Sequence, residues 1–150
     1  MEQPILKLSD MRSTTRIAYN WFIVNICKKL HPSELKNKLY RHIGVQIGKN
    51  VWISPDVVLD PVFPELIRIG DDVFIGWGTK IFTHQIDTDR TWKKDFVVLG
   101  NNCFIGGDCT IRCGVVVGVG AVVASNTLVN KNVPSFKLAI GIPMRIEELK

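Results

Sequence analysis

The sequence predicts an all-β protein, a parallel β-helix of six-residue repeats closed at its N-terminal end by a short helical cap. Three observations predict this fold. Aliphatic residues recur every six positions, residues that tolerate a left-handed backbone fill one fixed position of the repeat, and a helix-start signal precedes the first repeat. The 150 residues are expected to form one domain with a substantial core.

The six-residue period is clearest in the C-terminal half. From Leu99 the chain reads LGNNCF, IGGDCT, IRCGVV, VGVGAV, VASNTL and VNKNVP, each with an aliphatic residue first. The same frame covers IGDDVF, IGWGTK and IFTHQI from Ile69, and IGKNVW and ISPDVV from Ile47, while LDPVFPELIR between them shifts the phase. This period fits neither an amphipathic helix nor a straight alternating strand. It fits short strands that turn a corner every six residues, three to a coil of about 18 residues, with the aliphatic residues inside.

The fourth position of each repeat indicates where the corners lie. Gly, Asn and Asp tolerate a left-handed backbone, and with the exception of Val62 they fill this position in the repeats without histidine. The column comprises Asn50, Asp56, Asp72, Gly78, Asn102, Asp108, Gly114, Gly120, Asn126 and Asn132. His84 stands in the same column, and histidine is also enriched at positive φ. The repeat leaves two interpretations of His84 open: a purely structural corner residue, or an outward side chain that meets a substrate.

The repeat is interrupted directly after His84. The segment DTDRTWKKDFVV, from Asp87 to Val98, lacks the expected aliphatic residues, and the pattern resumes in phase at Leu99. We therefore expect an excursion loop over residues 86–98. Long excursions from compact domains are usually functional or disordered, and Trp92 with mixed charge favours a loop that folds over a cleft. The interruption favours a functional role for His84.

Residues 1–42 are expected to form the helical cap. They contain the apolar stretch RIAYNWFIVNICKKL and a second helix that starts at Pro32-Ser33, with Leu35 and Leu39 on one face. A cap covers the first coil, as a stacked repeat requires. A peripheral membrane contact is the less favoured interpretation. It would use the cluster Tyr19, Trp21, Phe22 and Ile23 with Lys28 and Lys29 nearby.

Residues 43–146 are expected to form the β-helix, followed by a short tail at 147–150. Near the C-terminal end, Pro134 and Pro143 bracket an apolar segment, LAIGI. We expect LAIGI to pair with the last coil and protect its edge.

Composition narrows the classes of function. A formal net charge of +5 suits an anionic partner, but no run of Lys and Arg interleaved with aromatics predicts nucleic-acid binding. The four cysteines form no CxxC pair and no zinc-ligand spacing, which favours reduced core thiols in a cytoplasmic protein. The N-terminus does not have the pattern of a secretory signal, and no apolar window is long enough for a bilayer span.

Taken together, these residues resemble the hexapeptide-repeat acyltransferases. The resemblance covers about Ile43 to Ile146 and is carried by the hexads, the break at FTHQID, the resumption at VVLGNNCFIGGDC and the closing AIGIPMRI. Within that family the sequence is most similar to the galactoside, maltose and polysaccharide O-acetyltransferase branch. The resemblance implies a left-handed β-helix, a homotrimer, and acetyl-CoA bound as acyl donor between neighbouring helices.

The resemblance also implies the site residues. The catalytic residue is His84, whose neutral imidazole acts as general base on an acceptor hydroxyl. Contacts to the coenzyme are implied at Gly107, Ala124, Ser125, Asn130, Lys131 and Arg145. Tight packing or a solvated charge would explain those residue types equally well. Contacts to the acceptor are implied at Asp60, Trp92 and Phe104, and no metal is implied.

Some positions depart from the family pattern. Gln85 follows the histidine in place of another motif residue, Phe104 stands where a tryptophan is common, Cys113 replaces a proline, and Met144 replaces a small residue. None of these changes removes the base, but they leave the acceptor undetermined.

The implied function is transfer of an acetyl group from acetyl-CoA to a sugar hydroxyl, in cell-surface polysaccharide biosynthesis. One alternative is N-acetylation of an amino sugar, or acetylation of a xenobiotic, on the same fold. A second is a non-catalytic trimeric scaffold. A third, a metal-dependent hydratase, needs about three protein ligands, and the repeat supplies only His84, with His31 and His42 before it.

Overall fold

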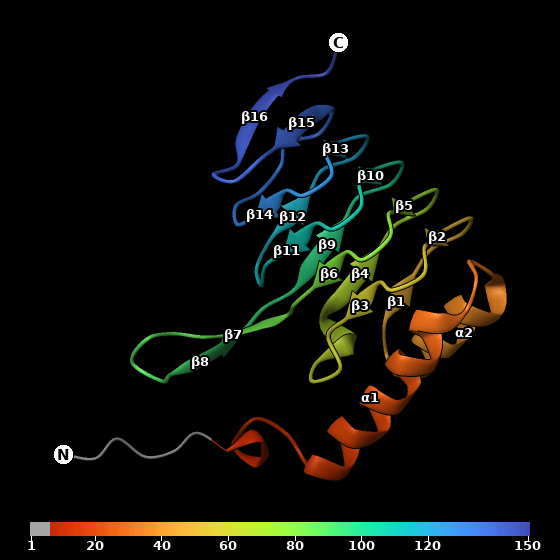
Figure 1. The fold of residues 1–150 in the computed structure, drawn as a ribbon, viewed down its shortest axis with the longest axis vertical. Coiled ribbons are helices and arrows are strands. Elements are labelled where there is room, and N and C mark those ends of the chain that lie inside the picture. The colour runs from red at the N-terminus through yellow and green to blue at the C-terminus, as the bar shows by residue number, and fades with distance from the viewer. Residues whose placement is uncertain (1–6) are drawn as a thin grey trace.

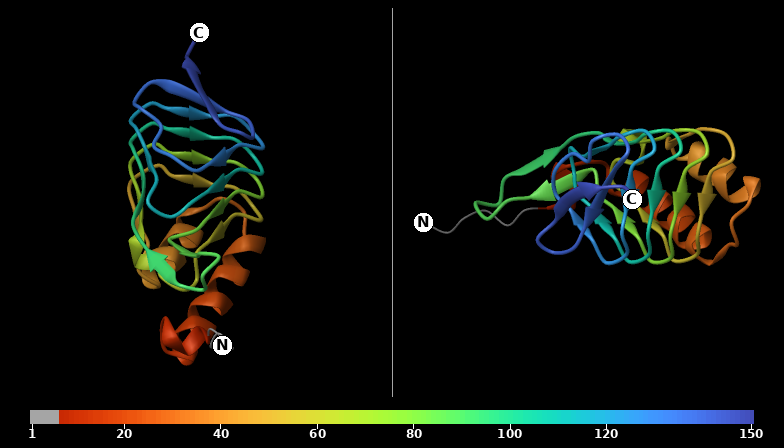
Figure 2. Two further views of the ribbon diagram at one scale, coloured as in Figure 1. Left: turned by 90° about the vertical axis from the view of Figure 1, so that its left-hand side faces the viewer. Right: turned by 90° about the horizontal axis from the view of Figure 1, so that it is seen from above.

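The computed structural model describes residues 7–150 as a three-sided parallel β-helix with two α-helices at its N-terminal end (Figure 1). Successive strands visit the three sheets in turn, so the chain coils and the coils stack from the N-terminal to the C-terminal end (Figure 2). The predicted coil of three short strands is therefore confirmed.

Each of the three sheets collects one short strand from each regular coil. The first contains β1 (Gln46–Ile47), β4 (Ile67–Ile69), β9 (Val97–Leu99) and β12 (Val116–Val117). The second contains β2 (Trp52–Ile53), β5 (Phe74–Ile75), β10 (Phe104–Ile105), β13 (Val122–Val123), β15 (Lys137–Ile140) and β16 (Arg145–Glu148). The third contains β3 (Val58–Leu59), β6 (Lys80–Ile81), β11 (Thr110–Ile111) and β14 (Leu128–Val129). All pairings within these three sheets are parallel except β15 with β16.

The core is made of stacked aliphatic side chains from the first position of each repeat. In the second sheet Ile53, Ile75 and Ile105 lie in register and are fully buried. In the third sheet Leu59, Ile81 and Ile111 do the same. Neighbouring residues of these two-residue strands point outward, because side chains alternate along a strand. The interior is thus apolar, and chemistry is confined to the outer faces and corners.

Most of the predicted corners adopt the left-handed backbone. Positive φ occurs at Asn50, Asp56, Asp72, Gly78, Asn102, Asp108, Gly114, Gly120 and Asn126. Two residues of the column do not: within residues 7–150 the positive-φ set lacks Asn132 and His84. The prediction of His84 as a turning corner is therefore wrong. The chain bends at Thr83 and enters a strand at His84, where positive φ is not required.

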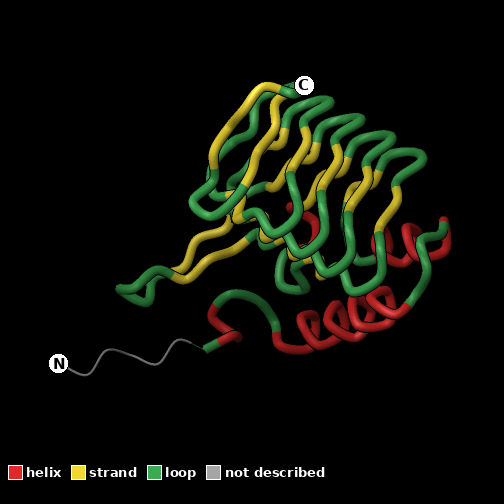
Figure 3. Tube along the Cα trace, turned by 45° about the horizontal axis from the view of Figure 1, so that its top comes forward, coloured by secondary structure: helices red, strands yellow, loops and turns green. Residues whose placement is uncertain are grey.

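The predicted excursion loop is a β-hairpin. β7 (His84–Ile86) pairs antiparallel with β8 (Trp92–Lys94), and the chain returns to the first sheet at Val97, two residues before the repeat resumes in the sequence. This β7–β8 hairpin projects from the side of the β-helix (Figures 1 and 3). At the other end of the chain, β15 pairs with β13, as expected for the LAIGI segment, and β16 folds back over β15.

The two helices pack against the first coil. A short 3₁₀ turn (Leu8–Asp10) precedes α1 (Thr14–Lys29), which buries Ile17, Ile23, Val24 and Cys27. α2 (Glu34–His42) begins at Ser33, whose Oγ accepts a hydrogen bond from the Lys36 N–H. Of the two leucines expected on one face of α2, Leu39 packs on the core but Leu35 is exposed. Within residues 7–150, neither helix nor any other is long and apolar enough to cross a membrane.

Candidate active site

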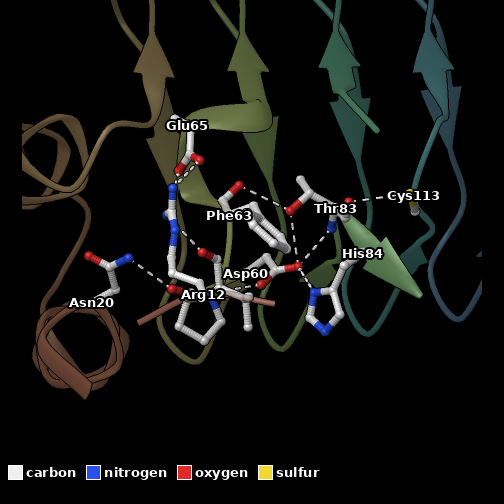
Figure 4. A network of polar contacts seen from close by, with 10 residues as sticks. Arg12, Asn20, Asp60, Phe63, Glu65, Thr83, His84 and Cys113 are labelled. Carbon is white, nitrogen blue, oxygen red and sulfur yellow. Dashed lines mark hydrogen bonds and ion pairs between the residues drawn. The ribbon is translucent and has the colours of Figure 1, made fainter. Parts of the chain in front are cut away.

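His84 forms a hydrogen-bonded pair with Asp60. The two side chains come from neighbouring coils, and His84 Nδ1 lies 2.5 Å from Asp60 Oδ2 (Figure 4). An ionised carboxylate only accepts hydrogen bonds, so Nδ1 carries the ring proton and donates it to Asp60. The neutral tautomer then has a basic Nε2. The His84 side chain is one-fifth exposed, so a bound molecule can reach it.

Asp60 is fully buried and held by donors on both of its oxygens. Oδ2 accepts the Thr83 N–H at 2.9 Å and lies 3.0 Å from the Thr83 hydroxyl, and Oδ1 accepts the Val62 N–H at 2.8 Å. Burial by itself would raise the pKa of Asp60, but the hydrogen bond and charge of His84, with the Thr83 and Val62 donors, hold that pKa below its usual value. The carboxylate therefore stays ionised behind the imidazole.

This position corrects the prediction that Asp60 contacts the acceptor. Its carboxylate has no exposed surface, and its two oxygens are occupied by protein donors. Asp60 can orient His84 but cannot meet a ligand directly.

Phe63 links this pair to the β7–β8 hairpin. Its ring, 1% exposed, makes an edge contact with His84 at 6.1 Å between centroids and stacks on Trp92 at 5.8 Å. Lys94 Nζ lies 4.4 Å from the same ring. Trp92, predicted to contact the acceptor, thus has one ring face against Phe63.

The segment before α1 braces the loop that carries Asp60. Arg12 pairs with both carboxylate oxygens of Glu65, at 2.6 and 3.0 Å, and donates to the Val62 carbonyl at 2.9 Å (Figure 4). Asn20 of α1 donates to the Pro61 carbonyl at 2.9 Å. The loop that carries Asp60 and the short 3₁₀ turn Pro64–Leu66 is therefore tied to the N-terminal residues on one side and to His84 on the other.

A pocket of about 340 Å³ opens beside His84 on the outer face of the third sheet. It is lined by Phe82, His84, Gln85, Thr110, Arg112, Cys113 and Leu128. Arg112 donates to the Gln85 side-chain carbonyl at 2.9 Å, and the Cys113 thiol donates to the Thr83 carbonyl. Burial raises the pKa of Cys113, so the thiol stays protonated and does not compete with His84 as a proton acceptor. A larger hollow, about 470 Å³, lies on the first sheet and does not include His84.

The predicted coenzyme contacts fall in three places. Gly107 and Ser125 stack at the corner between the second and third sheets, with Gly107 N–H donating to Ser125 Oγ at 3.1 Å, and Ala124 precedes Ser125. A Cβ at Gly107 would lie 3.2 Å from the Trp77 carbonyl oxygen, so a side chain there would crowd the preceding coil. Asn130 and Lys131 follow β14, and Arg145 opens β16.

Phe104 lies apart from His84 within one chain. It stands on the outer face of the second sheet, stacked on Phe74 at 4.7 Å, and Phe74 stacks on Trp52 at 6.3 Å. Phe104 is 45% exposed to solvent. The structure therefore brings Asp60 and Trp92 to His84 but leaves Phe104 and the Gly107 corner on other faces.

Three residues of the site were missed from the sequence: Thr83, Phe63 and Arg12. Thr83 adjoins His84 in the chain, so an inward hydroxyl beside the base was a usable signal. Arg12 and Phe63 gave none, because their roles depend on contacts between distant parts of the chain. Arg12 contacts Val62 and Glu65, 50 and 53 residues away, and Phe63 contacts His84 and Trp92. Within residues 7–150, no three His, Cys, Asp or Glu side chains are grouped so as to hold a metal ion.

Comparison with known proteins identifies the family. Residues 96–131 match the family model described as the hexapeptide repeat of succinyl-transferase. The protein YvoF of Bacillus subtilis (strain 168), which carries an acetyltransferase name, is 36% identical over 87% of this chain and 76% of its own length. The galactoside O-acetyltransferase of Escherichia coli (strain K12) is 25% identical over 77% of this chain and 70% of its own length.

Solved structures agree. A hexapeptide-repeat acetyltransferase of Vibrio cholerae O1 biovar eltor, complexed with acetyl coenzyme A, has a TM-score of 0.75 and 27% identity, covering 91% of this chain and 88% of its own. A galactoside acetyltransferase in complex with coenzyme A has a TM-score of 0.68 at 20% identity, covering 97% and 83%, which shows a shared fold. The chain belongs to the hexapeptide-repeat acetyltransferases, as the sequence resemblance predicts.

Proposed function

We propose that this protein transfers an acetyl group from acetyl-CoA to a hydroxyl of a sugar in cell-surface polysaccharide biosynthesis, with His84 as general base. The observation that carries the proposal is the buried Asp60 on His84 Nδ1, which leaves Nε2 as the basic atom beside a pocket. The names of two relatives, a galactoside and a colanic acid biosynthesis acetyltransferase, support a sugar as the acceptor. A similar solved structure, complexed with acetyl coenzyme A, supports acetyl-CoA as the donor.

The proposed reaction proceeds through His84 Nε2. The imidazole takes the proton of the acceptor hydroxyl while its oxygen attacks the thioester carbonyl, and the Asp60 carboxylate stabilises the imidazolium that forms. When the tetrahedral intermediate collapses, the carbon–sulfur bond breaks and the imidazolium returns its proton to the departing thiolate. The products are the acetyl ester and CoA, and His84 is neutral again.

The same proposal assigns a left-handed coil and a homotrimer in which each site is shared between two copies. Within one chain, the Gly107 and Ser125 corner and the His84 corner lie at opposite ends of the third-sheet strands. A donor lying along the glycine corner of one copy would therefore meet His84 of a neighbouring copy. In this arrangement the pantetheine arm of the coenzyme would lie against Gly107, Ala124 and Ser125. The coenzyme phosphates would lie nearer Asn130, Lys131 and Arg145. Phe104 would lie near the acceptor.

Turnover measurements test the base. His84→Gln should lower CoA release from acetyl-CoA with a panel of sugars by about 10²- to 10⁴-fold, while the melting shift caused by CoA persists. His42→Gln, on α2, is the matched control and should keep wild-type turnover. Turnover by His84→Gln equal to wild type would show that the base is wrong. Activity on amino sugars alone would favour the N-acetyltransferase alternative.

Co-expression tests the shared site. His84→Gln and Ser125→Trp should each be inactive alone, but mixed oligomers should regain activity, because some sites combine an intact His84 from one copy with an intact Ser125 from another. A site contained in one chain would give no recovery. The non-catalytic alternative predicts that CoA causes no melting shift, whereas binding at 100 times Kd adds about 2.7 kcal/mol.

A further inference from the structure

Helix α1 has an apolar face that the β-helix does not cover. The side that packs inward buries Ile17, Ile23, Val24 and Cys27. On the opposite side Tyr19, Trp21, Phe22 and Ile26 are 43%, 58%, 57% and 38% exposed. We call these four residues the outer face of α1. The sequence suggested Ile23 as part of this cluster, but Ile23 is buried in the core and Ile26 takes its place.

A helix that is apolar on both sides is normally enclosed on both. Exposing several large apolar side chains to water is unfavourable in free energy, and contiguous exposed apolar patches mark interaction surfaces. Three of the four residues are aromatic, and two of these, Tyr19 and Trp21, carry a polar group suited to a boundary between water and hydrocarbon. Tyr19 also uses its hydroxyl on His42 Nε2, at 2.8 Å.

The charged side chains of α1 itself are all cationic. They are Arg16, Lys28 and Lys29, and the helix contains no Asp or Glu. A second copy of the same face would bring these cations together and would be repelled. An anionic surface would be attracted to them, and the chain as a whole is also cationic, at +5.

Length decides how the helix would meet such a surface. α1 has 16 residues, and no helix within residues 7–150 is long and apolar enough to cross a bilayer. Its inner side is already fixed to the first coil, so it can only lie along a surface with its aromatics inserted and its cations at the headgroups.

We propose that the outer face of α1 docks the protein on an anionic lipid surface. The docking does not depend on the proposed reaction. One consequence of docking does rest on the proposed reaction. Asn20 of α1 donates to the Pro61 carbonyl in the loop that carries Asp60, so a docked helix holds His84 at a fixed distance from the lipid. That arrangement suits an acceptor hydroxyl presented at the membrane.

Sedimentation with vesicles tests the docking. The wild-type protein should bind vesicles of equal parts phosphatidylcholine and phosphatidylglycerol, and bind more weakly to phosphatidylcholine alone or in high salt. Trp21→Gln/Phe22→Gln, which keeps good helix formers, should weaken binding by about 100-fold. Lys28→Gln/Lys29→Gln should weaken binding to the anionic vesicles by about 30-fold.

The chain offers a matched control. Trp77, in the turn after β5, is 58% exposed, the same fraction as Trp21, and lies outside α1. Trp77→Gln should bind vesicles as wild type does. Far-ultraviolet circular dichroism and the melting temperature should show that the α1 variants remain folded.

Three results would overturn the proposal. Wild-type protein could fail to bind the anionic vesicles, or Trp77→Gln could lose binding as much as the α1 variant. Light scattering could also show that Trp21→Gln/Phe22→Gln has fewer subunits than wild type, in which case the outer face is a contact between copies. Loss of CoA release in the His84→Gln variant would change neither vesicle binding nor the number of subunits, so the tests of docking and of the proposed reaction are separate.

Discussion

Two corners of the β-helix, one coil apart, have different structures although they occupy the same place in the repeat. They follow β6 and β11 and lie one above the other, with the Cys113 thiol donating to the Thr83 carbonyl. At the later corner the chain turns at Gly114 with φ of +83° and enters β12. At the earlier one it enters the β7–β8 hairpin at His84.

The difference teaches how a repeat makes a site. At a regular corner the backbone hydrogen bonds run to the adjacent coils, as from Asn102 N–H to the Asp71 carbonyl, and no partner outside the repeat is needed. At the His84 corner the imidazole is hydrogen-bonded to Asp60. Asp60 lies on a loop that Arg12 and Asn20 hold in place. Interrupting the repeat therefore creates a demand for long-range contacts, and those contacts orient the base.

The largest expected effect comes from removing the buried charge. Asp60→Asn replaces an acceptor oxygen with a donor that faces the N–H groups of Thr83 and His84. We expect stability to fall by about 1–3 kcal/mol and CoA release by about 10²- to 10⁴-fold. Chemical denaturation and steady-state kinetics measure both. Asp56→Asn, at an exposed regular corner with φ of +57°, should change stability by less than about 0.5 kcal/mol. Equal effects of the two variants would contradict the distinction between the corners.

Acid should affect the two kinds of corner differently. The folded-state pKa of Asp60 is lower than its unfolded value, so the unfolded chain binds more protons as pH falls. The stability from this group is present above its unfolded value, about 3.9, and is lost as pH falls through the lower folded pKa. Denaturation curves of wild type below about pH 4 should therefore be steeper in pH than those of Asp60→Asn. Identical pH slopes would show that Asp60 is not held ionised in the folded state.

An intermediate effect is expected from the N-terminal brace. Arg12→Met removes the contacts to Glu65 and Val62, which should lower turnover about threefold to tenfold through the Asp60 loop. The stability loss should be at most about 1 kcal/mol, because the Arg12 and Glu65 side chains are partly exposed. Arg41 is the matched control: it pairs with Glu34 and donates to the Ile47 and Gly48 carbonyls, away from His84. Arg41→Met should change stability similarly and leave turnover intact, and a comparable loss of turnover there would argue against a specific brace.

The smallest effect tests the regular corner itself. Asn102 has φ of +57°, so Asn102→Ala should cost about 1 kcal/mol, whereas Asn102→Gly should be nearly neutral. Melting curves compare the two, and turnover should be unchanged in both. If glycine destabilises as much as alanine, then side-chain contacts and not the left-handed backbone hold these corners.

Much of the fold could be predicted because the repeat is a local pattern. Six-residue spacing places Ile53, Ile75 and Ile105 in one buried column, and the Asn, Asp and Gly column marks most corners. His84 was misread as a turning corner, since nothing in the column shows whether the chain turns or runs on. The interruption of the repeat indicates a functional role for His84, but only the family resemblance makes it the catalytic base. The partnership with Asp60 depends on the irregular LDPVFPELIR segment, whose path no period determines.

The ring tautomer of His84 tests the central claim most directly. The claim is that the interrupted corner holds a neutral imidazole by its Nδ1–H on Asp60 and leaves Nε2 basic. Nitrogen-15 NMR of the imidazole, assigned by comparison with His84→Gln, should show that the neutral ring is the Nδ1-protonated tautomer, and Asp60→Asn should shift it. An Nε2-protonated ring in the wild type would contradict the account.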